Sequence, residues 1–249
     1  MEVHHHAHTE RKKWTHYFWE FLMLFLAVFC GFLAEYQLEH TIEHQREKEY
    51  IGSMIEDLGK DTANLSSVID NFLENENRLD KIMYGFDEGT KLVNIEWVKE
   101  FVLFAISGYK DFLYTDRTLQ QLKNSGGLRL IRNRKAAMGI IGYDASIKDL
   151  NGELRLLAEY QSIYDETVDK MWSFRQMYVD LGVIKWDSEK EIMLKKNYWV
   201  SNDQADYDYL YNKARAYRNG FNRIRREMLD IRIQAISLIT SLKTEYHFK

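Results

Sequence analysis

The chain combines one continuous apolar stretch with long segments in which apolar residues recur every three or four positions. The apolar stretch runs from Phe21 to Ala34 and is flanked by aromatic residues, among them Trp19 and Tyr36. With these flanks it reaches about 20 residues, or about 30 Å of helix, which matches the hydrocarbon core of a bilayer. Aromatic rings also favour the lipid–water interface. The pattern predicts a membrane-spanning helix over residues 17–36.

Three later segments each carry an apolar stripe with steps of four and three, which is typical of helices that bury one face. The first stripe covers residues 51–83 and is interrupted by Thr62 and Glu76, the second covers 136–178, and the third covers 210–242. The chain contains no proline, the strongest helix breaker. We therefore expect the membrane helix to continue into the first stripe and to end near Gly85. Two more long helices are predicted, over about 133–181 and 203–246.

Shorter elements are predicted between these helices. Asn94–Ile106 is expected to form a buried helical lid, and a helix starting at Asp116 is expected to end at Ser125–Gly127, where glycine suits a left-handed cap. The following residues 128–131 are expected to be extended or to form a turn, and a further short helix is expected around Ser188–Lys196. Asn133 and Asp203 are predicted N-caps, because their side chains can accept hydrogen bonds from backbone N–H groups.

The predicted fold class is all-α: a single N-terminal transmembrane helix that continues into an elongated antiparallel helical bundle of three long helices plus short helices. The predicted divisions are a cytoplasmic tail (1–16), the transmembrane helix (17–36), a polar stalk (37–50) and an extracytoplasmic bundle (51–249). Basic residues at 11–13 precede the span, whereas the residues after it are mostly acidic. This bias favours a cytoplasmic N-terminus.

Net charge, cysteine content and the residues after the apolar stretch limit the classes of function that the chain can have. The net charge is −4, so no global basicity indicates nucleic-acid binding. Cys30, the only cysteine, lies within the apolar stretch, which excludes a disulfide within the chain. A signal-peptide cut after Ala34 would place Phe32 where a small residue is needed, so the helix is interpreted as an uncleaved anchor.

One short motif is compatible with metal chemistry. His40 and His44 lie in the sequence HTIEH, which fits an inverted zinc-protease pattern and would place both rings on one helix face. A catalytic zinc needs a third protein ligand and a shaped pocket, so a solvated polar face is the favoured interpretation. Phosphate loops, nucleophile elbows and Cys/His clusters are absent from the sequence, and we expect neither a cofactor nor an enzyme.

Other candidate sites concern packing and binding. Phenylalanines at 3–4 spacing form an aromatic stripe on the membrane helix, and Ala27 and Gly31 form a small-residue pair that permits close approach of another helix in lipid. Polar residues in the second stripe would line a site between helices if a cavity lies there. The aromatic stripe comprises Phe18, Phe21, Phe25, Phe29 and Phe32, and the possible polar site comprises Gln161, Tyr164 and Arg175.

Two basic clusters are expected to pair with acidic helix faces such as Asp57, Asp61, Asp70 and Glu74, rather than to bind phosphate. The clusters are Arg129, Arg132, Arg134 and Lys135, and Arg215, Arg218, Arg223, Arg225 and Arg226.

The segments EFLMLFLAVFCGFLAEYQLEH, REKEYI and TLQQLKNSGGLRLIRN resemble an uncharacterised family of bacterial single-pass membrane proteins. These have a short cytoplasmic tail, one anchor and a helical extracytoplasmic region. The resemblance covers roughly the first 135 residues and implies a bacterial inner-membrane location. It brings no catalytic residue or cofactor.

Two functions remain open. The first is a membrane-anchored, non-enzymatic interaction or scaffold protein of the cell envelope, which binds partner chains or itself as well as membrane lipid. The second is a ligand-sensing bundle that signals through a separate partner.

Overall fold

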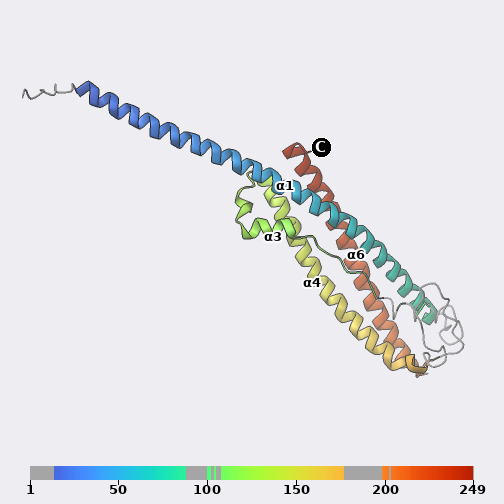
Figure 1. Cartoon of the computed structure of the whole chain (residues 1–249). Coiled ribbons are helices and arrows are strands. Elements are labelled where there is room, and N and C mark those ends of the chain that lie inside the picture. Colours follow the sequence, from blue (N-terminus) through green and yellow to red (C-terminus); the bar gives the residue numbers. More distant parts are fainter. Residues whose placement is uncertain are drawn as a thin grey trace, which may run out of the picture. The chain divides into compact units, whose positions relative to one another are not determined.

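A computed structural model describes residues 14–87, 100, 101, 104, 108–176, 198–201 and 203–248. The regular elements of the described residues are all helices, with no β-strand, as the sequence predicted. The chain divides into two compact units, Met1–Tyr50 and Ile51–Lys249. The main elements are α1 (Trp14–Asp87), α3 (Arg117–Asn124), the short 3-10 helix η2 (Gly127–Arg129), α4 (Arg134–Met171) and α6 (Gln204–Tyr246) (Figure 1).

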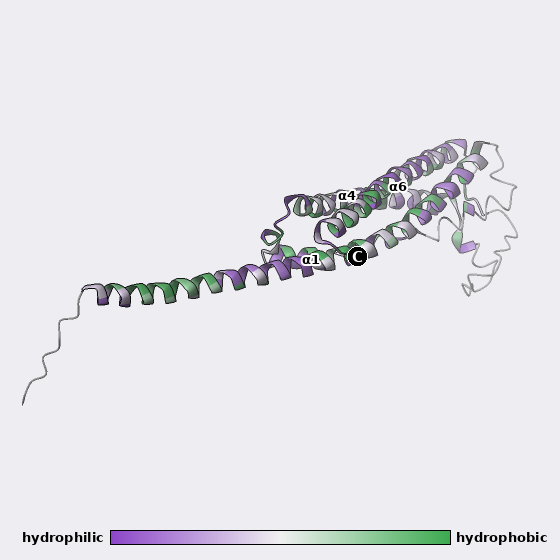
Figure 2. Cartoon of the chain, turned by 90° about the horizontal axis from the view of Figure 1, so that it is seen from above, coloured by the Kyte–Doolittle hydropathy of each residue, from purple (hydrophilic) through white to green (hydrophobic). Residues whose placement is uncertain are grey.

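Helix α1 runs unbroken from Trp14 to Asp87 and contributes to both units. This confirms that the apolar stretch continues directly into the first stripe, and that the helix ends near Gly85. In the first unit, the large apolar side chains of this stretch are exposed, Leu24 and Phe25 among them. The corresponding part of α1 is the green, hydrophobic portion in Figure 2.

The core of the second unit is built from the predicted stripes. On α1, the apolar side chains of Leu58, Leu65 and Phe72 are completely buried. Every predicted stripe position of α6 is buried: Leu210, Ala214, Tyr217, Phe221, Ile224, Met228, Ile231, Ala235, Leu238 and Leu242. A stripe with heptad spacing therefore identified the buried face of this helix.

Helices α4 and α6 lie side by side (Figures 1 and 2), and glycines allow them to approach closely. A Cβ atom at Gly139 would lie 2.7 Å from Cδ1 of Leu238, and one at Gly220 would lie 2.7 Å from Cδ1 of Leu157.

The predicted caps are confirmed. The side chain of Asn133 accepts a hydrogen bond from the N–H of Ala136 at 3.1 Å, and Asp203 accepts one from Ala205 at 2.9 Å. Gly126, just after α3, has φ 67°, the left-handed conformation expected there. Residues 128–131 were expected to be extended or to form a turn, and η2 covers two of them, Leu128 and Arg129.

Helix α4 ends at Met171, ten residues before the predicted end at 181, so that prediction was wrong. Trp172 is extended (φ −123°, ψ 129°) and pairs in an antiparallel bridge with Trp199. Ser173 donates to the carbonyl of Tyr198 at 2.9 Å, and Val200 donates to that of Met171 at 2.8 Å. These long-range backbone bonds replace the next helical turn.

Two predicted elements lie outside the described residues, entirely or in large part. The helix expected around Ser188–Lys196 lies entirely outside the described residues. Of the lid expected over Asn94–Ile106, only Glu100, Phe101 and Phe104 are described, and all three are helical. Both phenylalanines are buried, with Phe101 completely inaccessible.

Candidate functional site

Residues 108–116, which we call the return segment, have no regular secondary structure and follow α1 in the opposite chain direction. Three of their contacts establish this direction. The backbone N–H of Lys110 donates to Oδ1 of Asn71 at 2.8 Å, and Asn64 donates to the carbonyl of Leu113 at 3.3 Å. Further along, the N–H of Thr115 donates to Oδ1 of Asp61 at 2.8 Å.

The helix positions that make these contacts, 71, 64 and 61, share one face of α1, because they are separated by seven and three residues, about two turns and one turn of helix. The same face continues to Asp57, which accepts a hydrogen bond from the N–H of Thr118 at 3.0 Å. Side chains of α1 therefore satisfy backbone groups of a segment that forms no helix or sheet of its own. Sequence reasoning missed this role, although the spacing of Asn71, Asn64, Asp61 and Asp57 was a detectable signal.

We define the polar clamp as Asp57, Asp61, Thr115, Thr118 and Tyr143. Both carboxylates are buried, at 0% and 1% relative exposure. This corrects the expectation that they lie on an outer acidic face and pair with the two basic clusters. They are buried because the return segment and α4 cover them, and they are compensated by hydrogen bonds.

Asp57 is held from the side of α3. Thr118 donates both its N–H and its hydroxyl hydrogen to Oδ2, and Arg117 donates to Oδ1 at 2.9 Å. The carboxylate is thus partnered on both oxygens by the two residues that open α3. A buried charge with this many donors fixes where α3 begins relative to α1.

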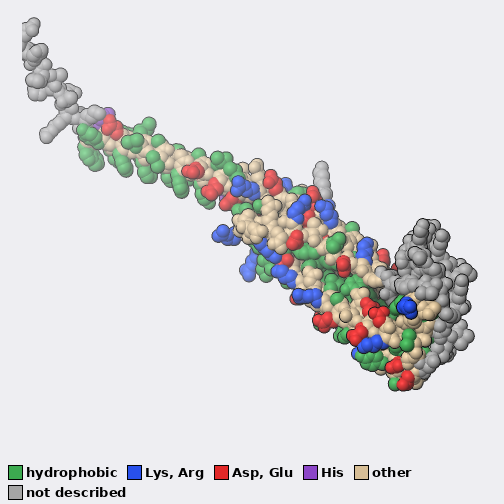
Figure 3. Space-filling model, turned by 60° about the horizontal axis from the view of Figure 1, so that its bottom comes forward, with side chains coloured by type: hydrophobic (Ala, Val, Ile, Leu, Met, Phe, Trp, Pro, Cys, Tyr) green, Lys and Arg blue, Asp and Glu red, His purple; other side chains and the backbone are tan. Residues whose placement is uncertain are grey.

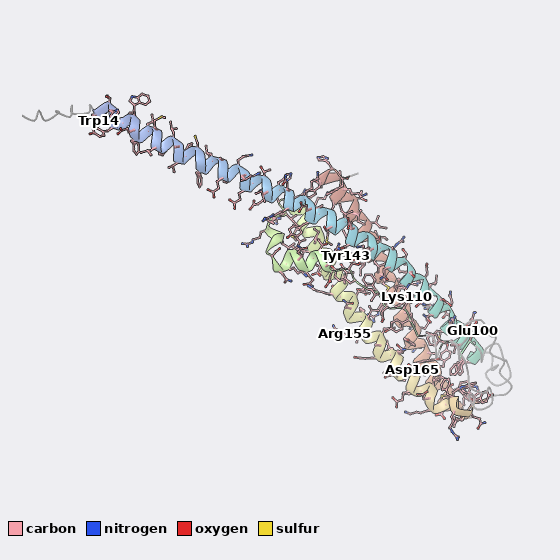
Figure 4. All side chains as sticks on the ribbon, viewed as in Figure 1. Trp14, Glu100, Lys110, Tyr143, Arg155 and Asp165 are labelled. Atoms are coloured by element: carbon pink, nitrogen blue, oxygen red, sulfur yellow. The ribbon has the colours of Figure 1, made fainter. Side chains whose placement is uncertain are left out.

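Asp61 is held from the side of α4. The hydroxyl of Tyr143 donates to Oδ2 at 2.9 Å, and Figure 4 shows Tyr143 where α4 faces α1. Burial raises the pKa of Asp61, and the hydrogen bonds from Thr115 and Tyr143 partly oppose that rise. Burial, with the nearby Asp61 charge, also raises the pKa of Tyr143. The phenol therefore stays protonated and serves as a donor.

A second buried acid links α3 to α4. Asp144 lies within 2.7 Å of Nζ of Lys123 and 2.8 Å of Nζ of Lys148. Burial acts to raise the pKa of Asp144, but the hydrogen bonds from the two lysines outweigh it, so the pKa is lowered. Together with the polar clamp, this ion pair fixes α3 between α1 and α4. Such an arrangement holds segments together and offers no free acid or base.

The basic cluster of α6 pairs with acidic residues, as expected, but with different ones. Arg225 contacts Glu76 at 2.6 Å, Arg218 contacts Asp80 at 2.8 Å, and Arg223 contacts Glu153. Glu76, a polar position within the first stripe, is 3% exposed and also accepts from Asn222 at 3.0 Å. The expected acid Glu74 instead bonds Arg78 on its own helix.

The three residues of the possible polar site are not brought together. Tyr164 is completely buried, with its ring 5.5 Å from that of Phe104 and 5.7 Å from that of Tyr217. Arg175 is exposed and lies beyond the end of α4, which corrects its placement in the second stripe. The residues that line the open hollow around Gln161 are Ala158, Ser162, Asp165, Glu166 and Asp169.

The residues lining this hollow all belong to α4, and its character is acidic. Burial, with the nearby Asp169, raises the pKa of Asp165 to about 6. Asp165 is labelled towards the far part of α4 in Figure 4. One helix face supplies the whole lining, so the hollow is not the cavity between helices that would indicate a ligand site.

The histidine motif lies on an exposed part of α1. His40 and His44 are both exposed, and Nδ1 of His44 is 3.5 Å from Oε2 of Glu47. Among the residues that the structure describes, no group of three or more His, Cys, Asp or Glu side chains could hold a metal ion. The geometry therefore adds no third ligand to the two histidines.

Within the first unit, the aromatic stripe is formed. Ring centroids of Phe21 and Phe25 are 6.2 Å apart, and those of Phe25 and Phe29 are 5.9 Å apart, both stacked. Phe32 is exposed beyond them. Ala27 lies on the opposite face, and a Cβ atom at Gly31 would meet nothing within 4 Å. The helix thus has one bulky and one small face.

Among the described helices, α1 is the one that is long and apolar enough to cross a membrane, by length and composition. None of its most apolar 18-residue window is buried. Core helices of soluble proteins and signal sequences can share such length and composition. No family model, curated protein or solved structure matches this chain.

Proposed function

We propose that this protein is a membrane-anchored, non-enzymatic interaction or scaffold protein of the bacterial cell envelope. The observation that carries the proposal is the exposed apolar stretch of α1, which continues without a break into the core of the second unit. Exposed Phe and Leu side chains along several helical turns are unfavourable in water. Lipid would cover them.

The proposed topology follows from the charges beside the span. Residues 1–16 form a cytoplasmic tail, 17–36 cross the inner membrane once, 37–50 form a polar stalk and 51–249 form a periplasmic bundle. In that bundle, the long helices are α1 from Ile51, α4 and α6. Support for α6 running antiparallel to α1 comes from the pairs Asp80–Arg218 and Glu76–Arg225. The contacts of Gly139 with Leu238 and of Leu157 with Gly220 support the same direction relative to α4.

A scaffold role is supported by how the polar residues are used. The buried acids at 57, 61, 76 and 144 each have hydrogen-bonding partners within the second unit. Groups that catalyse acid–base reactions must instead reach a substrate. The first unit offers two surfaces for association: the aromatic stripe and the small-residue face of Ala27 and Gly31.

Membrane anchorage is tested with the full chain expressed in bacteria. We expect it to stay with membranes after alkaline carbonate washing. Leu24→Lys places a charge near the centre of the span and costs about 2.5–3.5 kcal/mol of insertion free energy, so much of the variant should be released. Leu38→Lys, at an exposed residue beyond the span, is the matched control and should remain with the membranes.

The scaffold role is tested by gentle detergent extraction with cross-linking and mass spectrometry. A stoichiometric protein cross-linked to α1, α4 or α6 supports it. If the protein is recovered alone, the proposal is wrong.

Self-association is tested by oxidising native Cys30, which is exposed on α1. Packing through Ala27 and Gly31 would yield a disulfide-linked dimer that Gly31→Leu prevents, because Leu separates the helices.

A further inference from the structure

An apolar stripe on α1 continues from the proposed span into the stalk. It advances in alternating steps of four and three residues, and from Tyr17 to Ile42 only Glu35 interrupts it. This is the heptad spacing of a helix that packs along a second helix. The stripe, which we call the anchor stripe, comprises Tyr17, Phe21, Leu24, Val28, Gly31, Glu35, Leu38, Ile42, Gln45 and Glu49.

In the stalk, the anchor stripe carries all the large apolar side chains between residues 37 and 49. The other residues there are polar, whereas Leu38 and Ile42 lie about one turn apart and are 61% and 39% exposed. Figure 3 shows hydrophobic side chains, in green, uncovered along this part of α1. Two exposed aliphatic residues on one face of an otherwise polar helix indicate that this face packs against another chain.

The first unit itself does not cover this face. Every residue of the anchor stripe is exposed. Within the proposed span, lipid covers the stripe, but Leu38 and Ile42 lie beyond residue 36. A helix that stands in water gains most of its stability from packing of its apolar face. A second helix along the stalk would provide that packing.

We propose that the stalk of α1 packs along the stalk of a second copy of this chain, parallel and in register, through the anchor stripe. The inference rests on the membrane anchorage proposed above and deepens it by naming the partner and the face. Two copies anchored in one membrane point the same way and present Leu38 and Ile42 at the same depth. Each stripe residue therefore meets its own counterpart across a twofold axis.

The residue types in the stripe favour two parallel strands. In heptad notation, Val28 and Ile42 occupy a positions, and Leu24 and Leu38 occupy d positions. A β-branched residue at a with Leu at d is the combination that favours a parallel two-stranded coiled coil. Glu35 is also at an a position, where a polar residue lowers stability but fixes the register.

The charges beside the stripe complement one another in this register. Glu49 is at an a position, Arg46 is at e and Lys48 is at g, on either side of the stripe. In a parallel pair, an a residue packs between the flanking residues of the other helix. Each Glu49 thus lies near Arg46 and Lys48 of the second copy, and the twofold symmetry makes this arrangement occur twice.

Disulfide formation by the full chain in phosphatidylcholine vesicles tests the pairing. In a Cys30→Ser background, Gln45→Cys places a thiol at an exposed d position and leaves Leu38 and Ile42 unchanged. A disulfide needs Cα atoms within about 7 Å, so in-register pairing favours it there. His44→Cys, the adjacent residue and about 100° round the helix, is the control. We expect mild oxidation to give at least about fivefold more covalent dimer for Gln45→Cys.

Two double variants, each made in the Gln45→Cys chain, assign the disulfide to the anchor stripe. Leu38→Gln/Ile42→Gln should lower the yield of dimer at least about fivefold, because the apolar contact is lost. His40→Gln/His44→Gln changes the opposite side of the same turns and should leave the yield unchanged. Equal yields for Gln45→Cys and His44→Cys, or an undiminished yield in the first double variant, would overturn pairing through this stripe.

Chains of two lengths identify the partner. Tagged and untagged Gln45→Cys chains are expressed together in bacteria, and the isolated membranes are oxidised. A mixed dimer beside the two pure dimers supports a second copy, whereas a disulfide to a different protein alone overturns it.

Carbonate washing separates this proposal from the anchorage. Protein that stays in the vesicles but forms no disulfide at residue 45 overturns the pairing and leaves the anchorage standing. Protein that carbonate releases overturns the anchorage, and the disulfide assay on the same sample then decides the pairing separately.

Discussion

The hydroxyl of Tyr143 on α4 donates a hydrogen bond to the buried carboxylate of Asp61 on α1, with 2.9 Å between the oxygens. This single contact joins residues of two helices that are 82 positions apart in sequence. The same carboxylate accepts from the backbone of Thr115 in the return segment. Asp61 therefore holds three separate parts of the second unit together, and its partners should be important for stability.

Tyr143→Phe is expected to destabilise the second unit by about 2 kcal/mol, because Asp61 stays buried and charged with one donor fewer. For a protein of this size that lowers the melting temperature by about 4–8 °C. Thermal unfolding of the full chain in mild detergent, followed by circular dichroism, measures this. Tyr84→Phe removes a hydroxyl from a side chain that is 65% exposed and should leave the melting temperature unchanged.

The Glu76–Arg225 pair predicts a compensating double variant. Glu76→Leu removes a buried carboxylate and leaves the half-buried Arg225 without it, which is expected to cost about 3 kcal/mol. Glu76→Leu/Arg225→Met replaces both charges with apolar groups and should come within about 1 kcal/mol of the unmodified chain. Denaturant unfolding of the four members of this cycle gives the coupling energy. Additive losses would show that the pair does not act as a unit.

Close approach of α4 and α6 predicts opposite effects at two glycines. Gly220→Ala forces a Cβ against the fully buried Leu157 and the ring of Tyr160, whereas a Cβ at Gly152 of α4 meets nothing within 4 Å. Alanine favours helix over glycine by about 1 kcal/mol, and overfilling a core costs about 1–3 kcal/mol. We expect Gly152→Ala to be more stable than the unmodified chain. Gly220→Ala should be about 2 kcal/mol less stable than Gly152→Ala. Equal stability in denaturant unfolding would contradict a tight interface.

The regular parts of this fold were predictable, and the irregular connections were not. The stripe of α6 repeats without a polar interruption from Leu210 to Leu242, so periodicity alone identified its buried face. Asn133 and Asp203 were recognisable caps because capping depends on the next few residues. The early end of α4 depends instead on Trp199, far along the chain, and no local pattern reveals such a partner.

In the candidate site, too, some buried polar residues were predictable from the sequence and others were not. Glu76 was recognisable in the sequence because it interrupts an apolar stripe. In the structure it is buried and forms an interhelical ion pair with Arg225. Asp57 and Asp61 lie beside that stripe, where polar residues normally face water. They are buried only because the return segment covers that face of α1, and the contacts of Lys110 and Thr115 with it join residues 39 and 54 positions apart. The periodicity of the apolar positions does not predict such a covering segment; the one sequence signal is the helical spacing of Asn71, Asn64, Asp61 and Asp57.

Asp165 predicts a dependence of stability on pH. Its pKa is about 6 in the folded chain, raised from an ordinary value of 3.8. Between these values the folded state binds more protons than the unfolded state, so this group makes folding less favourable as pH rises through that window. The contribution disappears below pH 3.8, where both states are protonated, and is complete above about pH 6.

Asp165→Asn should therefore stabilise the chain near pH 7 by about 1 kcal/mol, a value reduced because water screens this half-exposed group. Near pH 4 the variant and the unmodified chain should have almost the same melting temperature. Glu166→Gln is the control on the neighbouring residue. Lys170 lowers the pKa of Glu166 through a hydrogen bond. Replacing the Glu166 carboxylate should therefore not stabilise the chain at any pH. A gain for Asp165→Asn that is constant with pH would show that burial of this carboxyl is not its cause.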